Sequence, residues 1–477
     1  MKQAPKTGFA RRLSTRIQSL FGRSETLRVS GTASVLIAIR TLGTLGTFAY
    51  TVLMARMMSP QDFGLIWTLL SAVYLCSYLT TLNIGAVAIR EMVKARSAGD
   101  DATATGFVVI SRRILLVVTG PAVLGFVGVI WWRNPAVLAD HWIAVLIAAA
   151  MIPVMGWNMT NSQQATALGQ AVRSQLPREL VRPFVFLVAL GTVWAIGVTL
   201  NLEEIIALYL VIVVLVALFQ YVLIARFFAF TKGQTPNITG WKRWMFSGIM
   251  LSPTRLVSDQ LKSVLIMAAA LSLGSAGVAK LAIALNIVNF MNFAVTAVEM
   301  AFSAKTSQSL LQGVKAGVPG KQMIRATHFI AVSGALKMGL VIAGMLLFWL
   351  LMPSLIGLFG PGYEDSIGVA YWLLLIPASK AFFGNTILIE QIFDHRLEIM
   401  ISSLLGVAAL PLAAYFIVPA MARNGTDPVT ATAMVFALVL TGLQALRWAI
   451  CLWRTGVDAS VPGALWRRHR QRSGAAR

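Results

Sequence analysis

Seven ionisable side chains fall inside long apolar stretches of this sequence. They are the bases Arg40, Arg255, Lys262, Lys337 and Lys380 and the acids Asp259 and Glu299. A base at the centre of a membrane helix costs about 2.5–3.5 kcal/mol, so such residues normally face a cavity or a partner. Because the bases outnumber the acids, the surplus positive charge calls for an anion, and a phosphate or diphosphate group would supply it. We therefore treat the five bases as candidate substrate-binding residues.

Four of these bases have a similar estimated depth. Arg40, Arg255, Lys337 and Lys380 each lie about nine to eleven residues from one end of their apolar stretch, or ~13–17 Å at the rise of an α-helix. That depth is close to the midplane of a bilayer core about 30 Å thick. We expect the four bases to contribute to one anion site at that level.

The two acids allow two interpretations. Arg255, Asp259 and Lys262 share one helical face at spacings of four and seven residues, which favours a structural ion pair for Asp259. Alternatively, Asp259 carries a coupling proton. The same two roles, coupling or ion pairing, remain open for Glu299, which lies near the end of its apolar stretch.

Polar side chains also recur along two of the apolar stretches at helical spacing. Their positions predict polar walls of a central hydrated cavity, although asparagines inside membranes can also bridge helices. The candidate lining residues are Thr44, Thr47, Asn286, Asn289 and Asn292.

The elements that must position these residues are membrane-spanning helices. The chain is 57% hydrophobic and 12% charged, with a mean hydropathy of +0.75, and its apolar runs have the length that crosses a bilayer. Backbone groups in lipid must be satisfied within the segment, so the runs are helices. The expected spans are 31–54, 64–88, 114–131, 142–168, 183–200, 205–225, 245–271, 281–303, 326–352, 367–389, 399–419 and 430–453.

Lysine and arginine are distributed unevenly between the loops. If residues 1–30 are cytoplasmic, that side carries 31 of the 40 bases, the outer loops carry four, and five lie within spans. The positive-inside rule then predicts that both chain ends are cytoplasmic. We expect the membrane to be the bacterial inner membrane. The rule also accounts for the net charge of +22 without nucleic acid as a partner, because the bases do not gather on one compact face.

The fold class that follows is an all-α membrane protein with about twelve transmembrane helices. A loop with Gly233, Pro236 and Gly240 divides them into two six-helix lobes around a central cavity, a common plan among transporters. The expected organisation is a cytoplasmic basic segment 1–30, an N-lobe 31–228, a cytoplasmic central loop 229–244, a C-lobe 245–453 and a cytoplasmic basic tail 454–477.

Signs of an enzyme or of a cofactor are absent from the sequence. The four histidines have no metal-ligand spacing, no P-loop motif occurs, and no serine or cysteine has a credible catalytic partner. Cys76 and Cys451 lie in apolar runs and imply no disulfide framework. We expect no metal, no cofactor and no catalytic residues.

Three short motifs carry a resemblance to a known family. They are the turn Ala55–Gly64, the run Asn83–Glu91 at the end of the second span, and Leu358–Tyr363 before the tenth. With this layout, the sequence resembles the O-antigen-type polysaccharide flippases of the multidrug/oligosaccharidyl-lipid/polysaccharide exporter superfamily. The resemblance implies a V-shaped cavity, alternating access and a substrate of polyprenyl-pyrophosphate-linked sugars, destined for lipopolysaccharide O-antigen, capsule or exopolysaccharide.

Other functions remain open beside this one. A cation-coupled drug antiporter of the same superfamily should line its cavity with carboxylates, whereas bases predominate here. A lipid II flippase would carry a cargo with the same pyrophosphate. A membrane-embedded polysaccharide polymerase or acyltransferase commonly uses a large outer loop or a catalytic histidine, and neither is evident. The expected partners are the lipid-linked oligosaccharide, the bilayer, and a polymerase and glycosyltransferases of the same pathway, with the protein working as a monomer.

Overall fold

The computed structural model describes residues 34–133, 135–315, 321–384, 386–393, 396–455 and 457–463. The expected basic segment 1–30 and residues 464–477 of the expected tail lie outside these ranges. Within them, every regular element is helical. The sequence-based expectation of an all-α protein is therefore confirmed.

The helices follow one another with short connections. The first part of the chain forms the first helix (Ser34–Met57), α2 (Pro60–Thr80), α3 (Ile84–Ser97), α4 (Asp101–Arg133), α5 (Pro135–Asp140), α6 (Trp142–Ala167), α7 (Ala171–Leu176), η1 (Pro177–Val181), α8 (Arg182–Ala195), α9 (Leu202–Ile224) and η2 (Ala225–Thr231). The second part forms α10 (Trp241–Asp259), α11 (Leu261–Ala269), α12 (Ser275–Lys315), α13 (Lys321–Gly357), α14 (Ser366–Leu373), α15 (Leu375–Phe383), α16 (Thr386–Ile392), α17 (Arg396–Arg423) and α18 (Pro428–Thr455).

Local sequence explains where individual helices begin. The Ser59 hydroxyl accepts a hydrogen bond from the backbone N–H of Asp62, and Pro60 takes the first helical position of α2, where its missing N–H is not needed. At α9, Asn201 and Glu204 form a reciprocal capping box. The turn motif that carries the family resemblance is thus, in structural terms, a helix start.

Ten helices in the described part of the chain are long and apolar enough to cross a membrane. Two further crossings consist of shorter pieces. The loop before α10 contacts the start of α4, where the N–H of Asn237 donates to the Ala102 carbonyl, and the turn after α11 contacts the end of α4, where Arg133 donates to the carbonyls of Ala270 and Leu271. Since α4 is 33 residues long, α10 and α11 together cross the same thickness.

The other composite crossing is α7, η1 and α8, which differs from the expectation. The sequence predicted a fifth span over 183–200 preceded by a loop, whereas the helical run occupies residues 171–195 with a π-helical turn at Pro177–Val181. The expected single helix over 245–271 is also wrong, because the chain breaks at Gln260 between α10 and α11. In both places, polar residues inside the membrane region accompany the irregular backbone.

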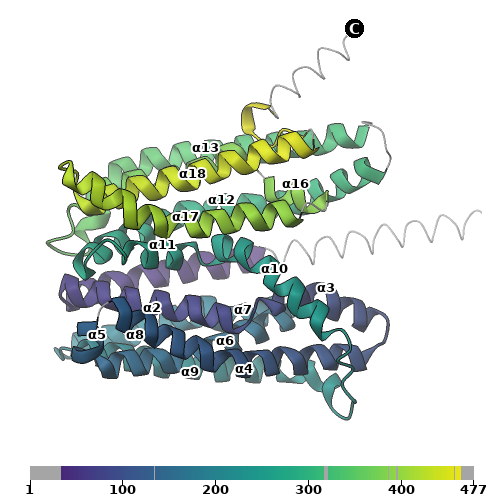
Figure 1. Ribbon diagram of the computed structural model, residues 1–477, viewed down its shortest axis with the longest axis horizontal. Coiled ribbons are helices and arrows are strands. Elements are labelled where there is room, and N and C mark those ends of the chain that lie inside the picture. The colour runs from purple at the N-terminus through teal and green to yellow at the C-terminus, as the bar shows by residue number, and fades with distance from the viewer. Residues whose placement is uncertain are drawn as a thin grey trace, which may run out of the picture.

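The helices form two halves, and α10 slants between them (Figure 1). The first helix and α2–α9 lie in the lower half, and α12–α18 lie in the upper half. Besides α17, α10 packs against α3 of the other half. This packing is close, because a side chain at Gly248 would meet the Leu82 carbonyl oxygen at 2.5 Å.

At one end of the molecule, the end at which α5 lies (Figure 1), the two halves are in tight contact. A Cβ at Gly64 of α2 would lie only 1.8 Å from the Ser275 carbonyl oxygen of α12, and the rings of Phe63 and Tyr363 meet edge to face. The Arg56 side chain donates to the Leu358 carbonyl at 2.6 Å. We call these contacts the α5-end seal. It lies on the side that the charge distribution assigns to the cell exterior.

Candidate functional site

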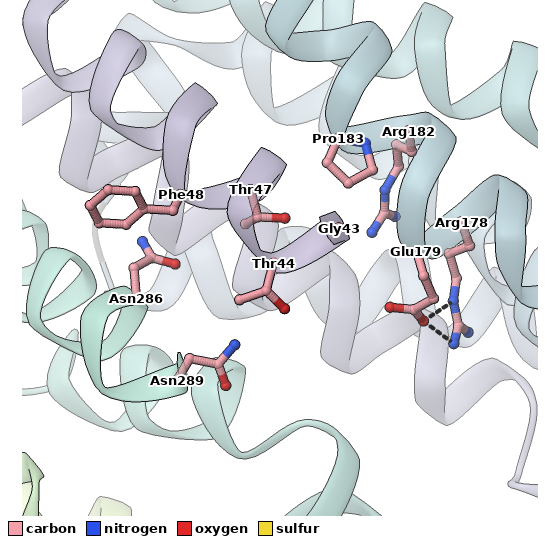
Figure 2. Close-up of a pocket in the computed structure, with 10 residues that line it drawn as sticks. All are labelled: Gly43, Thr44, Thr47, Phe48, Arg178, Glu179, Arg182, Pro183, Asn286 and Asn289. Atoms are coloured by element: carbon pink, nitrogen blue, oxygen red, sulfur yellow. Dashed lines mark hydrogen bonds and ion pairs between the residues drawn. The ribbon is translucent and has the colours of Figure 1, made fainter. Parts of the chain in front are cut away.

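A cavity of about 140 Å³ opens between three helical segments. The first helix and α12 form two of its walls, and the third wall comes from η1 and the start of α8 (Figure 2). Its lining residues are Gly43, Thr44, Thr47, Phe48, Arg178, Glu179, Arg182, Pro183, Asn286 and Asn289. Four of the five residues that the sequence suggested as polar lining are therefore found together, and the fifth, Asn292, lies further along α12.

The charged wall of this cavity was not anticipated. Arg178 and Glu179 are adjacent in η1, and the guanidinium donates to the Glu179 carboxylate at 2.5 and 2.9 Å (Figure 2). The positive charges of Arg40 and Arg182 also act on Glu179. Arg40 in addition donates to the Gln175 side chain at 3.0 Å. Three positive charges thus act on one carboxylate, of which Arg178 alone contacts it directly, and this leaves an excess of positive charge.

Close packing holds this arginine cluster, defined as Arg40, Arg178, Arg182 and Glu179, against the first helix. A Cβ at Gly43 would lie 1.8 Å from the Glu179 carbonyl oxygen, so only glycine permits the two backbones to approach so closely. The Arg182 guanidinium lies 5.7 Å from the centre of the Tyr74 ring, within cation–π range. The guanidinium groups therefore have defined positions beside the cavity.

A second group of bases lies in the other half of the molecule. Lys337 of α13 and Lys380 of α15 both reach Glu299 of α12, with nitrogen–oxygen distances of 3.4 and 3.1 Å. Lys380 also donates to the Thr296 hydroxyl at 3.1 Å. We use the name lysine pair for Lys337 and Lys380 together with their two partners, Glu299 and Thr296. The sequence-based suggestion of an ion-paired Glu299 agrees with this geometry.

The expected common level of Arg40, Arg255, Lys337 and Lys380 stays a prediction, whereas Lys262, the fifth base, lies at a different level from the two lysines of that set. Lys262 donates to Asn286 of α12 at 2.5 Å, whereas the lysine pair meets α12 at Glu299. These two positions are 13 residues apart on one helix, about 20 Å at 1.5 Å per residue. The helices α12 and α13 continue for 41 and 37 residues, well beyond the apolar runs from whose edges the depths were estimated.

The expected polar face through Arg255, Asp259 and Lys262 is also wrong, since the helix breaks after Asp259. Arg255 and Asp259 form an ion pair at 3.5 Å with both side chains more than 40% exposed. Lys262 lies apart from them, with its ammonium 3.6 Å from the centre of the Trp67 ring. It therefore joins α11 to α2 of the other half.

Several functional candidates were missed in the sequence. Arg178 and Arg182 were assigned to a cytoplasmic loop, and Arg447 to the cytoplasmic side, but all three lie in helices. Arg447 is 1% exposed and donates to the hydroxyls of Ser402 and Ser403. The buried Glu390 of α16 was overlooked as well. In the sequence, the hint of paired charges in this run is that Glu179 stands between Arg178 and Arg182. Periodicity alone does not distinguish the run from a loop.

Among the residues that the structure describes, no group of three or more histidine, cysteine, aspartate or glutamate side chains has the arrangement of a metal site. The chemistry that the two charged groups offer is electrostatic. Guanidinium and ammonium groups beside hydroxyls and amides bind oxyanions through charge-assisted hydrogen bonds. A phosphate-bearing head group suits this set of donors.

Solved structures with the same arrangement of helices are transporters. An inward-facing multidrug resistance MATE family transporter of the MOP superfamily matches with a TM-score of 0.65 and 14% identity, over 88% of this chain and 98% of that one. An outward-facing MATE family transporter matches with a TM-score of 0.59 and 12% identity, over 88% and 95%. The lipid II flippase MurJ, in an inward closed conformation, matches with a TM-score of 0.57 and 11% identity, over 89% and 88%.

At such low identity, these likenesses establish the fold alone. No family model and no curated protein matches the sequence. The chain is thus a multi-span, all-helical membrane protein with the fold of the MOP superfamily transporters. The fold that the sequence-based resemblance implied is confirmed, and membership of the superfamily and of its polysaccharide branch stays a prediction.

Proposed function

We propose that this protein is a flippase that moves polyprenyl-pyrophosphate-linked oligosaccharide across the bacterial inner membrane for export of a surface polysaccharide. The observation that carries the proposal is the surplus of bases in both halves. The arginine cluster has three bases and one acid, and the lysine pair has two bases and one acid. A diphosphate would neutralise this surplus.

In the proposed mechanism, the diphosphate enters between the halves while the polyprenyl tail stays in the lipid. Guanidinium groups of Arg178 and Arg182 grip phosphate oxygens with two parallel donors. The asparagines and threonines of the cavity wall offer hydrogen bonds to sugar hydroxyls. The α5-end seal then opens as the halves rock, and the head group leaves on the outer side.

Both chain ends lie in the cytoplasm in this proposal, so the substrate moves outward. A membrane potential that is negative inside favours the exit of an anionic head group by about 2.3 kcal/mol per charge and 100 mV. The polymerase and glycosyltransferases of the same pathway would act before and after this step. The protein itself works as a monomer and performs no covalent chemistry.

The fold is equally that of multidrug transporters, so charge must separate the two functions. A cavity for cationic drugs should attract positive charge, whereas this cavity is lined by Arg178 and Arg182 and contains one carboxylate, Glu179. Lipid II carries the same diphosphate, and the MurJ likeness makes it the second candidate cargo. A surface-polysaccharide precursor is preferred because of the motifs Ala55–Gly64, Asn83–Glu91 and Leu358–Tyr363.

The test is complementation of a bacterium that lacks the flippase of its surface-polysaccharide pathway. The wild-type chain should restore surface polysaccharide, and a variant with both Arg178→Ala and Arg182→Ala should not, at equal membrane levels. Arg173→Ala is the matched control, because this exposed arginine of α7 donates to Gln170 of its own turn and does not line the cavity. Normal export by the double variant would refute an anionic cargo held by these arginines.

A further inference from the structure

Glu299 joins two lysines that differ strongly in accessibility. Its Oε1 lies 3.4 Å from Nζ of Lys337, whose side chain is 1% exposed, and its Oε2 lies 3.1 Å from Nζ of Lys380, whose side chain is 33% exposed. The Glu299 side chain itself is 24% exposed. One carboxylate therefore connects a buried ammonium group to one that a ligand can reach.

This difference determines which contact is exchangeable. Lys337 is buried, and separating the two members of a buried ion pair is strongly unfavourable. Lys380 is partly exposed and has a second partner in the Thr296 hydroxyl at 3.1 Å. The Glu299–Lys337 contact is thus the stable one, and the Glu299–Lys380 contact is the one that an incoming anion can replace.

We propose that Glu299 is an internal competitor for the substrate. In the empty protein its carboxylate occupies the position on Lys380 that a substrate phosphate takes, and it stays with Lys337 when the phosphate arrives. This inference rests on the proposed function and assigns a positioning role to a residue outside the arginine-lined cavity.

The consequence is that the strength of anion binding and the rate of export change in opposite directions when Glu299 is altered. Two anions beside one ammonium group repel each other, so Glu299 weakens the hold of Lys380 on the phosphate and speeds its release. The carboxylate then neutralises Lys380 again while the empty protein returns. Glu299→Gln should therefore bind anions more tightly and yet export more slowly, a combination that a purely structural role does not produce.

The contacts of Lys380 with Thr296 and Glu299 place its ammonium group beside α12, the helix that also forms one wall of the arginine-lined cavity. From Asn289, the spacing of seven and ten residues places Thr296 and Glu299 on one side of the helix, and Asn289 lines the arginine cavity. The lysine pair is about 15 Å from Asn289 along α12. A substrate that entered from the end of the molecule at which α3 lies, opposite the α5-end seal (Figure 1), would meet Lys380 first and the arginine cluster afterwards.

The experiment measures inorganic pyrophosphate binding to purified full-length protein by calorimetry, together with surface-polysaccharide export. Glu299→Gln is expected to lower the Kd about three- to tenfold, where tenfold corresponds to 1.4 kcal/mol, and to reduce export. Glu398→Gln is the control, since Glu398 pairs with the exposed Arg454 at 3.5 Å. Its Kd should equal that of the wild type.

Two double variants test whether a change in pyrophosphate binding results from misfolding or from an indirect effect. Glu299→Gln with Lys337→Met removes the buried pair together and should keep the tighter binding, while Glu299→Gln with Lys380→Ala should lose it. If the wild type binds pyrophosphate and neither Glu299 variant binds it more tightly, Glu299 is no competitor and the flippase proposal stands. If no folded variant and no wild-type protein binds pyrophosphate, both proposals fail.

Discussion

The two charged groups of this protein, the arginine cluster and the lysine pair, both contain more bases than acids but use different basic side chains. The arginine cluster consists of guanidinium groups fixed by an adjacent carboxylate, a glutamine and a close helix contact at Gly43. The lysine pair consists of one buried and one partly exposed ammonium group that share Glu299. Guanidinium is planar and can grip phosphate with two donors, whereas ammonium is a strongly hydrated point charge.

This contrast suggests a division of labour. A closely packed cluster that lines a cavity is suited to holding a head group, and a partly exposed lysine with an internal counter-ion is suited to receiving and releasing it. Both halves carry charge, yet only the cluster has enough preorganised donors to determine selectivity. The following variants test that difference, in order of expected effect.

The largest effect is expected in the arginine cluster. Arg182→Ala removes a charge-assisted donor worth roughly 1.5–3 kcal/mol, so export should fall at least about tenfold. Arg182→Lys should restore only part of it, because lysine lacks the planar fork. Surface polysaccharide is measured at matched protein level, and full rescue by lysine would show that charge alone matters at this position.

A smaller effect is expected at Lys380. Lys380→Ala should reduce export about threefold, because this partly exposed ammonium contributes a weaker, solvent-screened contact. Lys337→Met should change export less, since Lys337 is buried behind Glu299. A greater loss with Lys337→Met than with Lys380→Ala, at equal amounts of protein, would reverse the roles assigned to the two lysines.

The α5-end seal should respond in stability. Gly64→Val places carbon atoms where the Ser275 carbonyl already lies, and such overpacking typically costs about 1–3 kcal/mol. The melting temperature of purified protein should therefore fall. Gly125→Val in α4 has no atom within 4 Å of the new Cβ and serves as the control. Equal melting temperatures for the two variants would show that the seal is loose.

The smallest effect is expected at the Arg255–Asp259 pair. Both side chains are exposed and 3.5 Å apart, and pairs of this kind contribute about 0–1 kcal/mol. Asp259→Asn should therefore leave the folded yield within about twofold of the wild type. A large loss of folded protein that is recovered by adding Arg255→Ala would instead show that this pair is structurally essential.

The sequence allowed most of the membrane-spanning helices to be predicted, because apolar runs of bilayer length are typical of such helices. Thr44, Thr47, Asn286 and Asn289 were likewise found as cavity lining from helical spacing. Composite crossings were harder to predict. Arg178 and Glu179 form an ion pair inside the helical run, and Arg182 lies one turn further on, whereas a hydropathy profile counts each of the three as a separate penalty.

The partners of the buried bases were also hard to predict, and the cause is geometric. Hydropathy locates the apolar part of a helix, but Lys337 is positioned by its partner Glu299, near the end of the apolar part of a 41-residue helix. Contacts between helices distant in sequence determine such pairs. The ion pair between Lys337 and Glu299 joins residues 38 positions apart, and no local pattern predicts it.

The most direct test of an anionic cargo uses purified protein in liposomes. Transfer of a fluorescent polyprenyl-pyrophosphate-linked oligosaccharide between leaflets is compared with transfer of the same lipid carrying a neutral head group and with uptake of a cationic dye. The account predicts rapid transfer of the diphosphate lipid by the wild type, little by the Arg178→Ala and Arg182→Ala double variant, and none of the dye. Transport of the dye without transfer of the diphosphate lipid would contradict it.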